Sequence, residues 1–295
     1  MINISTPIHS RYGREDNILH SIFLCLIIIN LYSSFQLAKK YIQYWFNASN
    51  GKGHGIHSPF VFDLVQHVLN DKKEYDCYGK IEALRSQLLS NTNFIDVEDF
   101  GAGSAVIKTS RRAVHKIAAS SLKHKKYAQL LFNIVKYYQP ENIVELGTSF
   151  GITSSYLASG NPEATVYTLE GASSIAAIAK QNFESLNFKN IKLLQGSFDK
   201  TLPELFSTIQ KIDLAFIDGN HRKEATVEYF SRLLNFSTPS TIFILDDIHW
   251  STGMEEAWAA IQKHPSVTLT IDLFFIGLVF INPDFKVKQQ FQIRF

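Results

Sequence analysis

From Pro140 to the C-terminus, short apolar runs alternate with segments in which apolar residues recur every three or four positions. This alternation is typical of β-α units, in which the strands lie parallel and helices cover the sheet. Only "FFIG" separates the last two apolar runs, which is too short for a crossover helix, so these strands should pair antiparallel. The sequence thus predicts an α/β fold: a Rossmann-like, seven-stranded, mostly parallel sheet that ends in a C-terminal antiparallel hairpin. The predicted strands cover residues 143–146, 165–169, 191–194, 214–217, 241–245, 267–273 and 278–281.

Helical periodicity dominates the rest of the chain. We expect three regions: an N-terminal extension with an apolar segment (residues 1–40), an N-terminal helical cap (41–124) and a sheet domain (125–295). The predicted helices cover residues 31–46, 59–69, 78–90, 125–138, 154–159, 173–186, 202–209, 222–234 and 254–263.

The composition argues against two classes of protein. Lys and Arg (29) nearly balance Asp and Glu (27) over 295 residues, with no long run of one sign, so nucleic acid is not an expected partner. The two cysteines, Cys25 and Cys77, lie far apart and outside any C-x-x-C motif, which excludes a disulfide framework and a cysteine zinc site. A reducing, cytoplasmic location fits best.

The stretch from residue 17 to residue 38, "NILHSIFLCLIIINLYSSFQLA", contains no formally charged residue and is long enough to cross a bilayer. Only residues 22–29 are continuously apolar, and Lys39 and Lys40 follow. Three alternatives remain open: a soluble extension, a membrane anchor through residues 17–38, and a signal peptide, which the missing A-x-A-like site disfavours.

Two glycine turns compete for the role of a nucleotide loop: "VEDFGAGSAV" at residues 97–106 and "VELGTSFGIT" at residues 144–153. Such a loop needs a buried strand before it, glycines within it and a helix after it. The later turn has all three. The earlier turn follows three carboxylates in four residues and precedes a basic polar segment, so we interpret it as a turn in the cap.

The later turn has the pattern E-x-G-x-x-x-G, which differs from the G-x-G-x-x-G of NAD-binding enzymes. A second acid, Glu170, closes the next predicted strand, where a carboxylate can accept both ribose hydroxyls of a nucleotide. Glu145 and Glu170 also have a structural interpretation, as ordinary strand-end acids. The pattern favours a nucleoside ligand other than NAD.

Five motifs carry a resemblance to a known family: "VELGTSFGITSSYLA", "TVYTLEGA", "LLQGSFDKTLPEL", "DLAFIDGNH" and "TIFILDDIHW". In this order and spacing they resemble the strand-end motifs of class I S-adenosylmethionine-dependent methyltransferases, particularly the catechol O-methyltransferase-like branch. The resemblance covers roughly residues 125–295 and implies that they form the methyltransferase domain. The N-terminal half, with "HGIHSPFVFDLV" and "DFGAGS", resembles a bacterial subgroup of these proteins and implies no substrate.

The resemblance implies S-adenosyl-L-methionine as cofactor and assigns its pocket by position. The glycine turn would surround the methionine part, Glu170 would bind the ribose, and the residues after the third strand would lie beside the adenine. The cofactor-binding residues implied are Glu145, Gly147, Thr148, Gly151, Glu170, Gly196, Ser197, Phe198 and Asp218.

Methyl transfer requires the acceptor atom to be held in line with the methyl group and to lose a proton. In the catechol-type branch the positions of Asp218, Asp246 and Asp247 carry a divalent metal, usually Mg²⁺, although the branch has asparagine where Asp247 stands here. The need for Mg²⁺ therefore stays open, because strand-end acids also occur in methyltransferases that use no metal.

Two histidines are candidate proton acceptors. His221 stands where the branch has a general-base lysine, and an imidazole can take this role, although it could instead begin a helix. His249, followed by Trp250, should face the same cleft as a base, a metal ligand or a pocket wall. Asp218, His221 and His249 are the catalytic candidates, whereas His54 and His57 lack a third ligand and are interpreted as structural.

Three other classes of protein compete with this interpretation. One is a non-catalytic cofactor-binding or regulatory protein on the same fold, and another is an NAD-dependent oxidoreductase, which the missing G-x-G-x-x-G disfavours. The third is a serine hydrolase, because "GTSFG" formally matches the nucleophile elbow and would make Ser149 the nucleophile. We expect a methyltransferase that acts on an oxygen of a small-molecule acceptor.

Overall fold

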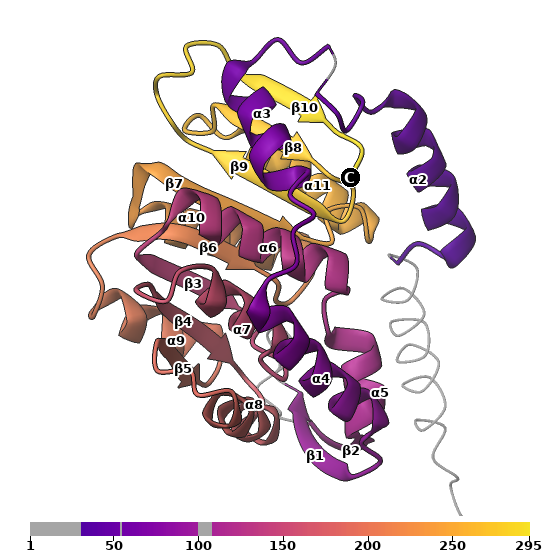
Figure 1. The fold of residues 1–295 in the computed structure, drawn as a ribbon, viewed down its shortest axis with the longest axis vertical. Coiled ribbons are helices and arrows are strands. Elements are labelled where there is room, and N and C mark those ends of the chain that lie inside the picture. The colour runs from indigo at the N-terminus through magenta and orange to yellow at the C-terminus, as the bar shows by residue number, and fades with distance from the viewer. Residues whose placement is uncertain (1–30, 54, 100–107) are drawn as a thin grey trace, which may run out of the picture.

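A computed structural model describes residues 31–295 except 54 and 100–107. An eight-stranded sheet, in the order β10-β8-β9-β7-β6-β3-β4-β5, forms its centre (Figure 1). From residue 125 on, the elements are α6 (Lys125–Tyr138), β3 (Asn142–Leu146), α7 (Ile152–Gly160), β4 (Thr165–Glu170), α8 (Ser173–Ser185), β5 (Ile191–Gln195), α9 (Phe198–Phe206), β6 (Ile212–Ile217), α10 (Lys223–Leu234), β7 (Ser237–Asp246), α11 (Thr252–Lys263), β8 (Leu269–Asp272), β9 (Ile276–Phe280) and β10 (Gln289–Gln292).

The sheet confirms the predicted fold class. All seven predicted strands are present, β3 to β7 pair in parallel, and β9 runs antiparallel to both β7 and β8. The prediction missed β10, an edge strand parallel to β8. Its sequence "QQFQ" is too short and too polar to show the apolar run by which a buried strand is recognised.

The order of the strands reverses at β3, which has β4 on one side and β6 on the other. In open α/β sheets, ligands bind outside the carboxyl ends of the strands at such a switch point. Successive side chains of β3 point to opposite faces of the sheet. Ile143 packs on the face covered by α6 and α7, whereas Val144 packs on the face covered by α9, α10 and α11. The buried core therefore fixes which β3 side chains lie under α7.

The cap contains a β-hairpin that the sequence analysis did not predict, so it is not purely helical. The strands "FIDVED" and "KTSRRA" pair antiparallel, with Asp96 opposite Arg111, and they lie outside the eight-stranded sheet. Charged residues on both strands hide the period-two apolar pattern, while opposite charges across the pair suit antiparallel pairing. The cap elements are α2 (Ser34–Asn47), α3 (Pro59–Leu64), η2 (Val65–Leu69), α4 (Asp76–Ser90), β1 (Phe94–Asp99), β2 (Lys108–Ala113) and α5 (Val114–Ser121).

Helix α2 stands at one side of the molecule, beside the β8–β10 edge of the sheet (Figure 1). Within the described residues, no helix is both long enough and apolar enough to cross a membrane. Most of the uncharged stretch 17–38 precedes residue 31 and lies outside the described residues.

Candidate functional site

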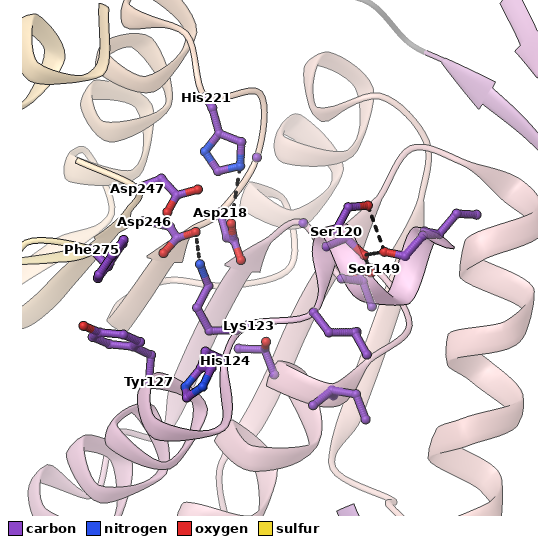
Figure 2. A pocket seen from close by; sticks show the side chains of 18 of the residues that line it. Ser120, Lys123, His124, Tyr127, Ser149, Asp218, His221, Asp246, Asp247 and Phe275 are labelled. Atoms are coloured by element: carbon purple, nitrogen blue, oxygen red, sulfur yellow. Dashed lines mark hydrogen bonds and ion pairs between the residues drawn. The ribbon is translucent and has the colours of Figure 1, made fainter. Parts of the chain in front are cut away.

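A cavity of about 840 Å³ opens at the carboxyl ends of β3, β6 and β7, where the strand order reverses (Figure 2). Its sheet side is formed by the ends of these strands and the loops that follow them, including Gly147, Asp218 and Asp246. The opposite side comes from the chain between α5 and α6 and from aromatic residues. Four of the side chains that the sequence analysis assigned to the chemistry, Asp218, His221, Asp246 and Asp247, thus meet at the expected edge of the sheet.

The glycine turn after β3 owes its shape to close packing. Gly147 has φ +104°, and a Cβ atom there would lie 2.4 Å from the carbonyl oxygen of Asp218. Gly151 has φ +81°, and a Cβ atom there would lie 2.3 Å from the ring of Phe183. Both positions therefore require glycine. Gly147 and Thr148 line the cavity, whereas Gly151 shapes the turn from behind.

Glu170, at the end of β4, lies where two cavities meet. Its carboxylate accepts hydrogen bonds from the backbone N–H groups of Ser149 (2.9 Å) and Ala172 (3.0 Å). Burial raises the pKa of Glu170, although these backbone donors partly counter the effect. It lines the main cavity and a second one of about 510 Å³, which contains Gly196, Ser197 and Phe198. The assigned ribose and adenine residues therefore lie in one continuous region.

Glu145 lies behind the glycine turn and is not part of the cavity wall. It is fully buried, and its Oε2 atom accepts hydrogen bonds from Ser154 and, at 2.6 Å, from Thr168. Burial raises its pKa to about 7. Because β3 directs Glu145 towards α7, this acid ties the helix after the turn to the sheet.

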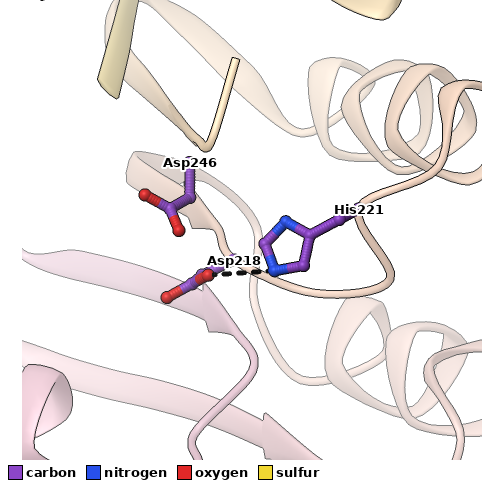
Figure 3. Close-up of side chains that lie close together, drawn as sticks. All are labelled: Asp218, His221 and Asp246. Carbon is purple, nitrogen blue, oxygen red and sulfur yellow. Dashed lines mark ion pairs between the residues drawn. The ribbon is translucent and has the colours of Figure 1, made fainter. Parts of the chain in front are cut away.

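A cluster of acidic residues occupies the β6–β7 end of the main cavity. Ligand atoms of Asp218, His221 and Asp246 all lie within 4.8 Å of one another (Figure 3), and Asp247 lines the same wall. His221 Nε2 lies 3.6 Å from Asp218 Oδ1. Burial raises the pKa of Asp218 to about 6, even though the nearby ammonium of Lys123 acts in the opposite direction.

Lys123 is a charged residue of this site that the sequence analysis missed. It lies in the short connection between α5 and α6, and its Nζ atom bonds to Asp246 (Figure 2). Burial alone would lower the pKa of Lys123, but Asp218, Asp246 and Asp247 raise it. A lysine in "SLKHKK" resembles any surface lysine, so no signal in a single sequence could have identified it.

Aromatic side chains from distant parts of the chain complete the cavity. Tyr41 comes from α2, Tyr127 from α6, Phe275 from the turn between β8 and β9, and Phe295 from the C-terminus. Tyr127 packs against both Phe275 and Phe295, with ring centroids 5.6 Å apart in each pair. Arg112 lines this cavity as well. This wall suits a small acceptor with apolar surface.

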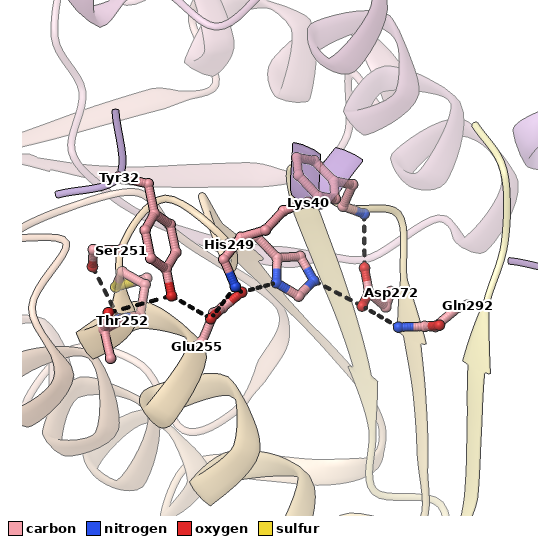
Figure 4. A network of polar contacts seen from close by, with 10 residues as sticks. Tyr32, Lys40, His249, Ser251, Thr252, Glu255, Asp272 and Gln292 are labelled. Atoms are coloured by element: carbon pink, nitrogen blue, oxygen red, sulfur yellow. Dashed lines mark hydrogen bonds and ion pairs between the residues drawn. The ribbon is translucent and has the colours of Figure 1, made fainter. Parts of the chain in front are cut away.

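The structure does not bring His249 into the cavity. Its Nδ1 atom contacts Glu255 at 3.0 Å and its Nε2 atom contacts Asp272 at 2.9 Å (Figure 4). Glu255 also accepts hydrogen bonds from Lys40 and Tyr32, so the network attaches the α2 region to α11 and the sheet. With both ring nitrogens engaged, His249 is a structural residue here, and the expectation that it faces the cleft is wrong.

The α2 attachment should weaken at alkaline pH. Burial lowers the pKa of His249, but hydrogen bonds to Asp272 and Glu255 outweigh it and raise the pKa above 6.5. The charged imidazole therefore stabilises the attachment fully below about pH 6.5, and this contribution is lost as pH rises through the raised pKa. Lys40, whose pKa is also raised, stays charged throughout, and the lowered pKa of Glu255 keeps that carboxylate ionised. Hydrogen exchange of α2 amides, corrected for intrinsic rates, should show more opening at about pH 9 than at about pH 6.

A His249→Gln variant provides the control, because glutamine can hydrogen-bond but does not titrate. Its α2 exchange should vary little over the same pH range. Equal opening of α2 in wild-type protein at both pH values would contradict the role assigned to His249.

The remaining sequence candidates divide as follows. Trp250 is 41% exposed and does not line the main cavity, and His57 is exposed. The hydroxyl of Ser149 pairs with that of Ser121 at 2.7 Å, so within the described residues it has a serine, not a histidine, as its partner. This arrangement argues against the hydrolase interpretation. His54 and the glycines of residues 100–107 lie outside the described residues.

Part of the chain is similar in sequence to known methyltransferases. Residues 144–248 match a family model described as a methyltransferase domain. The O-methyltransferase imqG of Aspergillus flavus is 28% identical over 114 residues, which cover 37% of this chain and 45% of that protein. The chain thus matches less than half the length of this relative.

Solved structures share the fold. An O-methyltransferase from Bacillus cereus in complex with S-adenosylhomocysteine has a TM-score of 0.52 at 20% identity, covering 72% of this chain and 93% of the other. The S-adenosylhomocysteine-bound methyltransferase PaMTH1 from Podospora anserina has a TM-score of 0.54 at 13% identity, covering 76% and 97%. TomG from Streptomyces achromogenes, in complex with S-adenosylmethionine, has a TM-score of 0.51 at 18% identity, covering 71% and 91%.

Residues 144–248 are thus similar in sequence to a methyltransferase domain, and the described residues share the fold of solved methyltransferases. Residues 144–248, which match the family model, run from β3 to just beyond β7 and include the glycine turn and the acidic cluster.

Proposed function

We propose that the chain is an S-adenosylmethionine-dependent O-methyltransferase with a small-molecule acceptor, and that residues 125–295 are its catalytic part. The observation that carries this proposal is the position of Glu170. Two backbone N–H groups hold its carboxylate where a cavity with the glycine turn and the acids meets one with Gly196 and Phe198. In this arrangement the methionine part of the cofactor would lie at the glycine turn, its ribose at Glu170, and its adenine at Gly196 and Phe198.

The site residues have separate roles in this proposal. Bound S-adenosylmethionine would supply a methyl group from its sulfonium to the acceptor oxygen, which loses a proton. The imidazole of His221 lines the cavity beside Asp218, with Nε2 3.6 Å from Oδ1, and would receive the proton of the acceptor. Tyr127 and the aromatic wall hold the acceptor and exclude water.

A divalent metal such as Mg²⁺ is a separate question. Asp218, Asp246 and His221 are suitable donors, and Oδ1 of Asp246 lacks a hydrogen-bond partner among the described residues. The ammonium of Lys123, however, already contacts Asp246. The cluster as arranged therefore does not fit a metal without displacement of Lys123, and no step is assigned to one.

Two measurements test the proposed function. Calorimetry with S-adenosylhomocysteine should detect binding with one site per chain, whereas NADH should give no heat of binding. Methyl transfer from labelled S-adenosylmethionine should then be measured against a panel of hydroxylated small molecules. Failure to bind S-adenosylhomocysteine by folded protein would refute the proposal.

A further inference from the structure

We propose that Lys123 supplies, as a residue of the chain, the positive charge that a divalent cation would otherwise bring to the acidic cluster, so that the site works without metal. The cluster, defined as Asp218, Asp246 and Asp247, places three carboxylates on one wall of the main cavity. Such a group needs a cation in place to be compatible with a buried position. Lys123 is that cation. This proposal adds to the proposed function and rests on it only for its effect on methyl transfer.

Lys123 is directed into the cluster. Its side chain is only 12% exposed and the partner carboxylate of Asp246 is 1% exposed, so solvent does little to screen their contact. In Figure 2 the end of the side chain points towards Asp246 and Asp218. The ammonium also acts on Asp247 through its charge. The positive charge of Lys123 therefore interacts with all three carboxylates.

The backbone of Lys123 is held in place from the opposite side. Its carbonyl oxygen accepts a hydrogen bond of 2.8 Å from Arg85 of α4. Arg85 also contacts Glu82 at 3.0 Å, and Glu82 accepts a hydrogen bond of 2.8 Å from Tyr156 of α7. A chain of contacts thus links Lys123 to the helix that follows the glycine turn. These contacts fix the position of the Lys123 backbone relative to the site.

This position conflicts with a metal at the same carboxylates. A metal bound by Asp218, His221 and Asp246 would lie at coordination distance from Asp246, on the carboxyl group whose Oδ2 atom Lys123 already contacts. Two cations at such short separation in a buried site repel each other strongly. Removal of the lysine charge should therefore expose a cation site that wild-type protein hides.

Electron paramagnetic resonance of Mn²⁺ tests the proposal without any measurement of activity. Wild-type protein at about 100 μM should leave the free Mn²⁺ signal nearly unchanged. Lys123→Met should reduce that signal, with affinity at least about tenfold higher than wild type because three carboxylates lose their counter-charge. Lys123→Arg keeps the charge and should behave as wild type does.

Lys126→Met is the matched control. Lys126 lines the same cavity, but its ammonium lies 4.2 Å from the ring centroid of Phe295, whereas Lys123 is the lysine that pairs with Asp246. Its removal should leave Mn²⁺ binding as weak as in wild type. If Lys126→Met gains Mn²⁺ affinity as Lys123→Met does, the specific role of Lys123 is refuted.

Wild-type protein alone can overturn the proposal, even if Lys123→Met fails to fold. Stoichiometric Mn²⁺ binding by wild type, or methyl transfer that stops in EDTA and returns with Mg²⁺, would show that a metal displaces Lys123. Methyl transfer unchanged by EDTA would support the proposal. Absence of S-adenosylhomocysteine binding would instead refute the proposed function, and the Mn²⁺ comparison would still decide the role of Lys123.

Discussion

Replacement of Glu170 by glutamine should strongly weaken cofactor binding. The carboxylate already accepts backbone hydrogen bonds from Ser149 and Ala172, and each oxygen retains a lone pair for a ribose hydroxyl. An amide would turn an NH₂ group towards one of those backbone N–H groups and could not serve both ribose hydroxyls. Loss of two hydrogen bonds to a charged group corresponds to a loss of affinity of about 10²-fold or more. Calorimetric titration with S-adenosylhomocysteine measures it.

Glu184→Gln, on the exposed face of α8, gives the same chemical change away from the cavities and should bind as wild type does. Near-wild-type affinity in a folded Glu170→Gln protein would mean that Glu170 only shapes the turn. A thermal melt of each variant separates this outcome from unfolding.

Replacement of His221 by alanine should reduce kcat about 10²-fold to 10⁴-fold, the usual range for loss of a general base. The affinity for S-adenosylhomocysteine should change little, because His221 groups with Asp218 and Asp246, and the hydrogen bonds that hold Glu170 come from backbone N–H groups. Steady-state kinetics with an identified acceptor and calorimetry on the same preparation separate the two effects.

His57→Ala is a suitable comparison, because His57 is an exposed histidine outside the cavity. It should retain full activity. If His221→Ala also retains its kcat, the proton of the acceptor must leave by another route, and the assignment of His221 fails.

The strands of the sheet could be predicted because the pattern that identifies each strand lies within the strand itself. The strands β3 to β7 each contain a short run of apolar residues, and the residues at their carboxyl ends meet at one edge because these strands are parallel. Gly147, Glu170, Asp218 and His221 could therefore be assigned to one cavity from the sequence. β1 and β2 were not predicted, because their pairing depends on charge complementarity between the strands and not on an apolar pattern.

Other parts of the site depend on packing between elements far apart in the chain. His249 follows β7 as expected, yet Asp272 and Glu255 bind both its ring nitrogens and hold it away from the cavity. Lys123 enters the cavity only because the α5–α6 connection passes over the ends of β6 and β7. Neither contact produces a pattern that can be recognised in the sequence.

Tyr41 of α2 lines the main cavity, so a residue far from the matched segment can help to determine which acceptor binds. The segment that matches the family model, residues 144–248, excludes Tyr41, Lys123, Tyr127, Phe275 and Phe295. Four of them, Tyr41, Tyr127, Phe275 and Phe295, form the aromatic wall that the proposed acceptor would contact. Two chains could therefore share every feature of the matched segment and still methylate unrelated compounds, so acceptor screening should be guided by sequence variation outside it.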